Sequence, residues 1–500
     1  MSSELRSSQR ESWLNAGRGP RSWVDYGAVY KRDWFIFIID SINIQIMTEQ
    51  NILDVQGQQP GLYKLYTQLC CVFPVAETSS QDAIISTLRS GMDRLRDSFP
   101  WLAGEVVNED ASDGNTGVYR ITPSDSIPLV VQDLQDDASA PTMETLRKAG
   151  YPCSMLDENI FAPGLTLNLP TNFGLAAESA FVFAIQANFI AGGLVLTSMS
   201  QHNVMDMTGQ AQILDWLSKA CYSLPFTEEE VSLGNPDRTR AISLLDEPYE
   251  PGPELAPQML PQLEEPAGDL ASSQLLKSTW AYLKFSALSL DELKSLATST
   301  LPYGFVSTDD TICAFLWKCI SRARIPRLQP GAKSTFARAV DVRQHVGLPA
   351  TYPGMLQNMT YSTNTLQDLG DTPLGTTAAE LRAKLTSKDR DLAYATRSLL
   401  TYISRSKDKT KTSPTASVDM SSGIALSSWS KINAYDLDFN LGLGKPEAVR
   451  RPGFTPVEGL LYLMPKSPNG DLAVQVCLRD EDWGRLRIDE EFMKYTTYLG

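Results

Sequence analysis

The amino-acid sequence predicts a mixed α/β protein with two domains of similar size. The chain has 500 residues, 42% of them apolar, which is too long for one core and sufficient for two domains of roughly 200 residues each. Apolar runs with strand character alternate with helical periodicities in both halves, and no internal repeat is visible. We expect a partly disordered extension at residues 1–51, an N-terminal domain at 52–228, a crossover linker at 229–270 and a C-terminal domain at 271–500.

In the first half, an apolar run predicts a strand at residues 62–75. Ser80 is a suitable helix cap, and apolar residues follow it at helical spacing: Ile84, Leu88, Met92, Leu95 and Phe99. Further strands are expected at 101–107 and within 117–132 and 179–200.

Between residues 226 and 270, prolines lie among acidic residues with little periodicity, which predicts an extended crossover and not a packed element. The second half restarts at residue 278. Its expected elements are a strand at 278–286, a helix from Ser289, a capped helix at 307–322, a strand at 337–343, helix over most of 378–404, strands from Gly423 on and a polar helix near 488–498.

Charge and cysteine usage exclude several classes of protein. A net charge of −15 argues against a general nucleic-acid binder, which carries a basic face. The seven cysteines show neither a disulfide framework nor a zinc pattern, so we expect a reducing, cytoplasmic compartment. The apolar stretch at residues 34–47 contains Asp40, Asn43 and Gln45, and it is too short and too polar for a membrane span.

The chain has only two histidines, which limits the choice of a general base. His202 ends an apolar run typical of a buried strand, and a helical pattern follows Gly209, so this histidine is predicted in a strand-to-helix turn. It opens the motif His202-x-x-x-Asp206-x-x-Gly209. The alternative is a turn histidine satisfied by a backbone carbonyl. His345 lies in a Gly/Pro loop and is interpreted as a surface or structural residue.

Two other places carry charged or glycine-rich motifs. Arg343 ends a predicted strand, where it is a substrate ligand or an ion-pair partner; if it pairs with Asp206, that carboxylate orders the turn. Residues 435–446 contain Gly-x-Gly-Lys, but Pro446 stands where a phosphate-binding loop needs Ser or Thr, and Phe439 where it needs Gly. The sequence has no His-Glu-x-x-His, Cys-x-x-Cys or Gly-x-Ser-x-Gly motif, so neither a metal site nor a serine hydrolase is expected.

Together these motifs resemble the BAHD acyltransferases, the acyl-CoA-dependent family with the chloramphenicol acetyltransferase-like fold. The His-x-x-x-Asp signature is complete, whereas the Asp-Phe-Gly-Trp-Gly signature survives in part as Asp438-Phe-Asn-Leu-Gly442. The altered second signature resembles the fungal branch that includes trichothecene 3-O-acetyltransferases. Other segments similar to that branch are Phe99-Pro-Trp-Leu-Ala-Gly104, Gly192-Gly193, Ser307-Thr308-Asp309, Tyr352-Pro-Gly354, residues 445–452 and residues 459–465.

The resemblance implies two α/β domains with mixed sheets and a channel between them, and a segment near 438–465 that packs with the N-terminal domain. It implies that His202 is the general base in transfer of an acyl group, most simply acetyl, from acyl-CoA to a secondary-metabolite alcohol such as a trichothecene-like sesquiterpenoid. Asp206 belongs to the catalytic motif and pairs with Arg343. Gly209, Asp438 and Gly442 shape the channel.

For the CoA, the resemblance suggests contacts from Ser307 and Thr308 at a helix N-terminus and from Lys445 and Arg451. No permanently bound cofactor and no metal are expected, and a monomer is the expected state. Two alternatives stay open. A peptide-synthetase condensation domain would need His at Gln201 and Gly at Met207, and a non-catalytic member of the fold would be consistent with the altered second signature.

Overall fold

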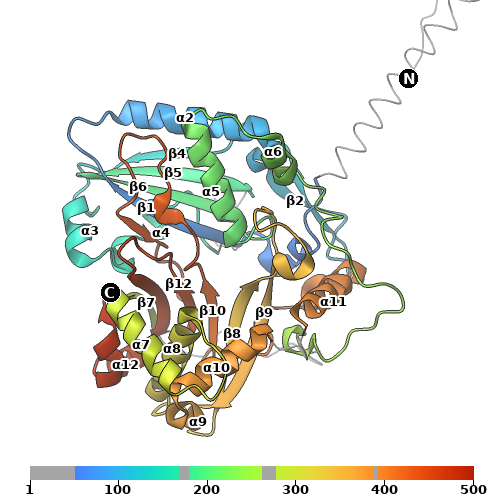
Figure 1. Ribbon diagram of the computed structural model, residues 1–500. Helices are drawn as coiled ribbons and strands as arrows, with labels where there is room; N and C mark the ends of the chain where they lie inside the picture. Colours follow the sequence, from blue (N-terminus) through green and yellow to red (C-terminus); the bar gives the residue numbers. More distant parts are fainter. Residues whose placement is uncertain (1–50, 168–179, 262–276, 387–390) are drawn as a thin grey trace, which may run out of the picture. The chain divides into compact units, whose positions relative to one another are not determined.

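Two large β-sheets form the framework of the computed structural model (Figure 1). The structure describes residues 51–167, 180–261, 277–386 and 391–500. One sheet has five strands in the order β11-β1-β6-β5-β4, and the other has seven in the order β14-β7-β13-β12-β10-β8-β9. A separate hairpin pairs β2 (Glu105–Glu109) with β3 (Val118–Thr122).

The central strands of the five-stranded sheet, β1, β5 and β6, are buried on both faces, and buried polar side chains such as Gln68 and Asn188 interrupt their apolar residues. In β1 (Tyr66–Pro74), Leu69 and Cys71 belong to one core cluster, and Cys70 and Val72 to the cluster on the opposite face. The other strands are β4 (Leu129–Asp133), β5 (Phe183–Ile190), β6 (Gly193–Gln201) and β11 (Ala448–Arg450).

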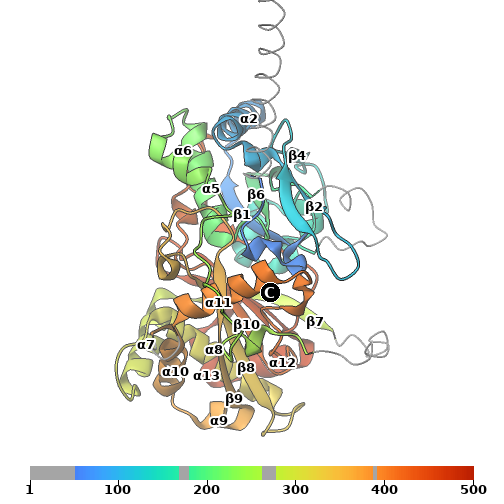
Figure 2. The same cartoon turned by 90° about the vertical axis from the view of Figure 1, so that its right-hand side faces the viewer.

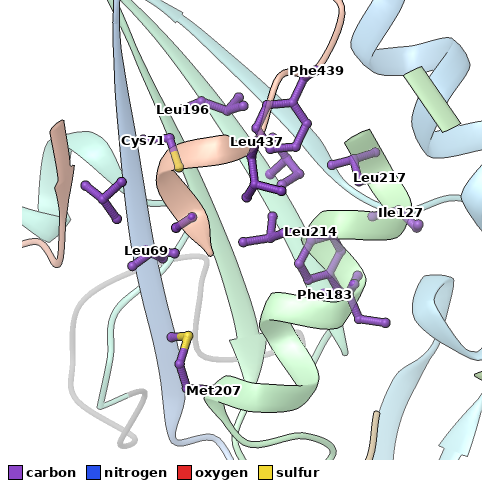
Figure 3. Packing of buried hydrophobic residues seen from close by; sticks show 14 of the residues in the cluster. Leu69, Cys71, Ile127, Phe183, Leu196, Met207, Leu214, Leu217, Leu437 and Phe439 are labelled. Carbon is purple, nitrogen blue, oxygen red and sulfur yellow. The ribbon is translucent and has the colours of Figure 1, made fainter. Parts of the chain in front are cut away.

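Helices α2 (Gln81–Ser98) and α5 (Met207–Cys221) lie side by side over one face of this sheet (Figure 1). Helices α3 (Met143–Ala149) and α4 (Glu158–Phe161) supply residues to the cluster on the other face. A late part of the chain also reaches this core. Figure 3 shows Leu437 and Phe439 packed between the sheet and Leu214 and Leu217 of α5.

The seven-stranded sheet is mixed, since β10 runs parallel to both β8 and β12 and the other pairs are antiparallel. Its strands are β7 (Ser278–Phe285), β8 (Lys333–Asp341), β9 (Gln357–Thr365), β10 (Ile424–Ser428), β12 (Leu460–Leu463), β13 (Leu472–Arg479) and β14 (Thr497–Tyr498). The helices of this half are α7 (Ala287–Ser299), α8 (Thr308–Arg324), α9 (Leu366–Asp371), α10 (Leu374–Thr386), α11 (Leu392–Arg405), α12 (Asp480–Leu486) and α13 (Glu490–Tyr495).

The two faces of the seven-stranded sheet belong to different cores. Ala281 and Leu283 of β7 join the core formed with the helices of this half, and Figure 2 shows α7, α8 and α10 together beside β8 and β9. Trp280 and Tyr282 instead join the core cluster that also contains α2 and α5. One continuous core therefore connects the two sheets.

Most predicted elements are confirmed, including the helix capped by Ser80 and the helix capped by Ser307. Four differ. Residues 100–103 form a 3-10 turn before β2, and the predicted helix at 378–404 is two helices, α10 and α11. The C-terminal helix ends at Tyr495 and is followed by β14.

The fourth difference lies in the predicted linker, which contains a packed element. Helix α6 (Glu228–Gly234) begins with a capping box between Thr227 and Glu230, a local signal that the proline-rich composition obscured. Farther along, Arg238 and Leu255 are buried at 4% and 1% exposure, so this stretch is part of the packed structure.

The five-stranded sheet takes a strand from the far end of the chain, because Cys70 of β1 pairs with Arg450 of β11. Residues 51–500 form one unit by their contacts, and the division into two domains at 229–270 remains a prediction. Residues 1–50 of the predicted extension lie outside the described residues. Across the described ranges, no helix combines the length and apolar character needed to cross a membrane.

Candidate active site

His202 directly follows the last residue of β6, in the turn before α5. Its backbone N–H donates to the Leu65 carbonyl at 2.7 Å, which ties the turn to the chain just before β1. The residues of β6 are fully buried, whereas His202 itself keeps part of its surface exposed. A rigid strand thus holds a histidine that is only partly buried.

The imidazole has a defined contact on one side. Nδ1 lies 3.4 Å from the carbonyl oxygen of Met205, at the long end for a hydrogen bond. Because a carbonyl oxygen can only accept, this contact places the proton on Nδ1 and leaves the lone pair on Nε2. The interpretation of a turn histidine bound to a carbonyl and that of a general base are therefore compatible.

Burial lowers the pKa of His202 below its ordinary value, and the positive charge of Arg451 acts in the same direction. The Asp206 carboxylate and the Met205 carbonyl oppose this shift without reversing it. At neutral pH the ring is therefore neutral and able to accept a proton.

Asp206 is buried inside the protein, with 4% exposure. Its carboxylate caps α5 by accepting from Gly209 N at 2.9 Å, and it also accepts from Leu356 N at 2.9 Å. The Arg343 guanidinium donates to both carboxylate oxygens, at 2.8 and 2.9 Å. Burial raises the pKa of Asp206, but the charge of Arg343 and these hydrogen bonds outweigh it and hold the pKa below its ordinary value.

Arg343 is fully buried two residues beyond the end of β8. Besides Asp206, its guanidinium donates to the carbonyls of Tyr352 and Gly354, each at 2.8 Å, and to Asp341 at 3.0 Å. The predicted Asp206–Arg343 ion pair is thus present, and it joins α5 to the loop that follows β8.

Gly209 lies where this loop touches α5. A Cβ at this position would stand 2.3 Å from the carbonyl oxygen of Pro353, so only glycine fits the approach of the two backbones. The third residue of the motif therefore serves close packing at the same junction that the ion pair holds.

Asp438 lies near the other end of α5, and Gly442 follows it in the same loop. The Asp438 carbonyl accepts from Ser218 Oγ at 2.6 Å, and its side chain accepts from the Asn440 N–H at 2.9 Å. Gly442 is exposed and has φ +73°, the left-handed region that favours glycine. These contacts make the loop a structural element attached to the C-terminal end of α5.

The four predicted CoA contacts lie in different parts of the chain. Ser307 and Thr308 begin α8, and the Ser307 hydroxyl exchanges hydrogen bonds with Asp310 in a capping box. Lys445 is exposed and pairs with Asp436 at 2.6 Å. Their roles remain predictions.

Arg451 is buried, with 2% exposure. Its guanidinium lies over the rings of Phe454 at 4.1 Å and Tyr462 at 4.4 Å, and Nη2 donates to Thr166 Oγ1 at 3.2 Å. Thr166 also accepts the backbone N–H of Tyr66, next to the Leu65 carbonyl that holds His202. Arg451 is therefore part of the interior near the base, whereas Lys445 is part of the surface.

The chain's other histidine, His345, is exposed in the loop after Arg343. No group of three or more His, Cys, Asp or Glu side chains among the described residues is arranged to hold a metal ion. Within this part of the chain, the neutral imidazole of His202 is the group suited to take a proton from a hydroxyl.

Sequence reasoning missed a second buried ion pair beside the His202 turn. Arg238 donates to Asp54 at 2.8 Å, and the Tyr352 hydroxyl also binds this carboxylate. No sequence signal marks Arg238, which lies in the proline-rich segment without periodicity. Asp54 precedes the first predicted strand by several residues, and nothing local distinguishes it.

The sequence matches known protein families and individual relatives over most of its length. Residues 65–221 match the family model described as trichothecene 3-O-acetyltransferase-like N-terminal domain, and residues 169–493 match that of the Transferase family. A trichothecene 3-O-acetyltransferase of Saccharomyces cerevisiae is 52% identical over 458 residues, covering 91% of this chain and 97% of the relative. The O-acetyltransferase dmxR13 of a Cryptosporiopsis species is 50% identical, covering 90% of this chain and 97% of the relative.

Among solved structures, F. sporotrichioides TRI101 complexed with coenzyme A and T-2 superposes with a TM-score of 0.83 at 47% identity, covering 90% of this chain and 99% of that one. The fold and the site thus define an acyltransferase of the BAHD type, as predicted. The chain belongs to the Transferase family, in the branch with trichothecene 3-O-acetyltransferase-like N-terminal domains, and it is an O-acyltransferase. The condensation-domain and non-catalytic alternatives gain no support from these matches.

Proposed function

We propose that this protein transfers an acetyl group from acetyl-CoA to a hydroxyl of a secondary-metabolite alcohol, with His202 as the general base. The relatives support acetyl transfer, because two of them, at 52% and 50% identity, are named O-acetyltransferases. The acceptor class we propose is a trichothecene-like sesquiterpenoid or another fungal terpenoid or polyketide alcohol, in line with a related structure that holds coenzyme A and T-2.

The observation that carries the proposal is the state of His202. The residue is half-buried, burial lowers its pKa, and its Nδ1 faces the Met205 carbonyl, so Nε2 is the available base. A base of this kind contributes about 10²- to 10⁴-fold to the rate when it is held within reach of the hydroxyl.

In the proposed reaction, Nε2 removes the proton of the acceptor hydroxyl as its oxygen attacks the thioester carbonyl. The resulting tetrahedral oxyanion collapses, the C–S bond breaks, and the imidazolium returns the proton to the leaving CoA thiolate. The products are the acetyl ester and free CoA. Because the thioester is already activated, no covalent enzyme intermediate is needed.

For CoA we keep Ser307, Thr308, Lys445 and Arg451 as proposed contacts. Lys445 is the exposed cation of the four, and Asp436 could release it to a phosphate. We further propose a monomer in the cytoplasm. The seven cysteines are buried and unpaired, which fits a reducing compartment.

The test measures free-thiol release from acetyl-CoA with a panel of terpenoid and polyketide alcohols that includes a trichothecene with a free 3-hydroxyl. We expect acceptor-dependent release by the wild type and a loss of at least about 10²-fold in His202→Ala. His345→Ala is the matched control, because it removes the other, exposed histidine, and it should keep full activity. Equal activity of His202→Ala and wild type would overturn the assigned base.

A further inference from the structure

Asp54 and Arg238 form an ion pair whose side chains are 2% and 3% exposed. The Asp54 carboxylate also accepts from the Tyr352 hydroxyl and from Met355 N at 3.3 Å. Arg238 lies over the ring of Trp101 at 4.4 Å, which fixes its other face. Burying two charges is costly, and apolar residues often replace such a pair without loss of stability, so stability alone is a weak reason for it.

The same nitrogen of Arg238 that meets Asp54 also donates to the carbonyl of Val204 at 2.9 Å. Val204 is inside the His202–Asp206 turn. On another side of the turn, the backbone at Gly57 comes so close to the Asn203 carbonyl that a Cβ at Gly57 would lie 2.1 Å from its oxygen. The turn is therefore in contact with the segment that contains Asp54 and with the segment that contains Arg238.

The two ion pairs around the turn share one loop, residues 352–355. Arg343 donates to the Tyr352 and Gly354 carbonyls of this loop, and Asp54 accepts from the Tyr352 hydroxyl and Met355 N. A closed path of contacts thus runs from Val204 through Arg238, Asp54, the loop and Arg343 to Asp206.

Met205 lies between the two residues that this path holds. Its carbonyl is the group that faces Nδ1 of His202. Within the turn, the Met205 N–H donates to the Gln201 carbonyl at 3.3 Å. The two ion pairs fix the residues on either side of Met205, so they contribute, with this bond, to the direction of its carbonyl.

We propose that Arg238 and Asp54 are positioning residues that, together with Arg343 and Asp206, aim the Met205 carbonyl at Nδ1 and so keep the lone pair of His202 on Nε2. The inference rests on the proposed role of His202 as base. Without the Val204 contact, the Met205 peptide can turn, and the imidazole divides between two tautomers, of which one presents an N–H to the acceptor hydroxyl and cannot accept its proton.

The two histidines make this tautomer directly measurable. In protein labelled with 15N-histidine, nitrogen chemical shifts at alkaline pH distinguish protonated from unprotonated ring nitrogens, and His345→Asn assigns the signals. We expect the wild type to show His202 protonated on Nδ1. A wild type protonated on Nε2 would overturn the proposal, whatever the enzyme assay shows.

The informative variant is the double change Asp54→Asn with Arg238→Met, which removes both charges and leaves no uncompensated buried ion. We expect its His202 signals to move toward a tautomer mixture, and kcat to fall about 10-fold or more while the KM for acetyl-CoA changes less than about threefold. Unchanged signals, or full kcat despite mixed tautomers, would overturn the proposal.

A control separates positioning from loss of stability. Leu478→Ala opens a cavity in the core of the seven-stranded sheet and should lower the melting temperature without changing the His202 signals. If Leu478→Ala shifts those signals as much as the double variant does, the change of tautomer follows from reduced stability of the whole protein, and the proposal fails. Because the NMR measurement needs no substrate, an error in the proposed acceptor or acyl donor leaves this test intact.

Discussion

The turn at residues 202–209 and the loop at residues 438–445 carry the two family signatures, and they differ in how their residues are held. In the turn, Asp206 and the partner Arg343 are buried at 4% and 0% exposure, and each has several hydrogen bonds. In the loop, Asn440 and Gly442 are exposed. The first signature is complete and the second is altered at two positions. Asn440 is exposed, where many residues are acceptable, whereas Leu441 is 8% exposed and keeps an apolar side chain in the core.

The loop is attached by contacts from unaltered as well as altered positions. Leu437 and Phe439 pack against α5 (Figure 3), and the Asp438 carbonyl accepts from Ser218. Backbone acceptors and apolar packing of this kind tolerate changes at neighbouring exposed residues. The loop can therefore keep its place without the glycine and tryptophan of the usual signature.

The largest expected effect within the turn is that of Asp206→Ala. It leaves Arg343 buried without its main partner and removes the cap of α5, so unfolding free energy should fall by about 3–5 kcal/mol, together with the rate. Urea unfolding monitored by tryptophan fluorescence measures this loss of unfolding free energy. Asp341→Ala is the matched control, because Asp341 contacts the same guanidinium with a side chain that is 43% exposed. Comparable losses in both variants would contradict a special role for the buried pair.

The same carboxylate predicts a pH dependence of stability. The pKa of Asp206 is lower in the folded protein than in the unfolded chain, so its contribution is present above the unfolded value and is lost as the pH falls through the folded one. The stability difference between wild type and Asp206→Ala should therefore shrink in acid. A difference that stays constant down to strongly acidic pH would rule out this ionised pair as the cause.

The next largest effects are expected from two glycine variants, one in the turn and one in the loop. Gly209→Ala pushes a Cβ into the Pro353 carbonyl, which should cost about 1–3 kcal/mol and reduce kcat, because Asp206 caps the same helical turn. Gly442→Ala has open space around it and only its positive φ as a penalty, about 1–2 kcal/mol, and should keep kcat. Melting temperature and kcat are measured for both. A greater loss of kcat in Gly442→Ala than in Gly209→Ala would contradict the conclusion that the turn, and not the loop, determines the rate.

These two regions also show what a sequence can predict. His202, Asp206 and Gly209 lie within eight residues, so a local motif is enough to find them, and Arg343 could be proposed because it ends a predicted strand. Arg238 and Asp54 could not be found this way. Each acts on the turn through a contact between residues far apart in the chain, 184 positions for their own pair, and their segments have no periodicity.

The dependence on contacts between distant residues also explains why the sequence could not distinguish the predicted CoA contacts from one another. Lys445 and Arg451 look alike in a basic segment of the sequence, and only the packing separates a surface cation from one enclosed by Phe454 and Tyr462. The sheets, by contrast, could be predicted element by element, since strand and helix periodicities are local. The joining of β11 to β1 depends on pairing across most of the chain, which no local pattern encodes.

A smaller effect is expected on the pH dependence of the rate. The pKa of His202 lies below its ordinary value, chiefly because of burial and further because of Arg451. Replacing Arg451 with Met removes a nearby positive charge, so the pKa should rise and the acid limb of the kcat/KM profile should move to higher pH. Lys445→Met, at the exposed end of the same segment, should leave the limb in place. A larger shift from Lys445→Met would contradict the separation of the two cations.

The smallest effect is expected where the second signature departs from the family. Asn440 has φ +55°, is exposed, and donates from Nδ2 to the Cys221 carbonyl at 3.2 Å. Asn440→Gly restores the usual residue and relieves the positive φ, but it loses that hydrogen bond and adds flexibility to the unfolded chain. The two contributions oppose each other, so stability should change by no more than about 0.5 kcal/mol and kcat should not change. A clear gain in kcat would mean that the altered signature limits catalysis, and that the exposed loop acts on the turn at the other end of α5.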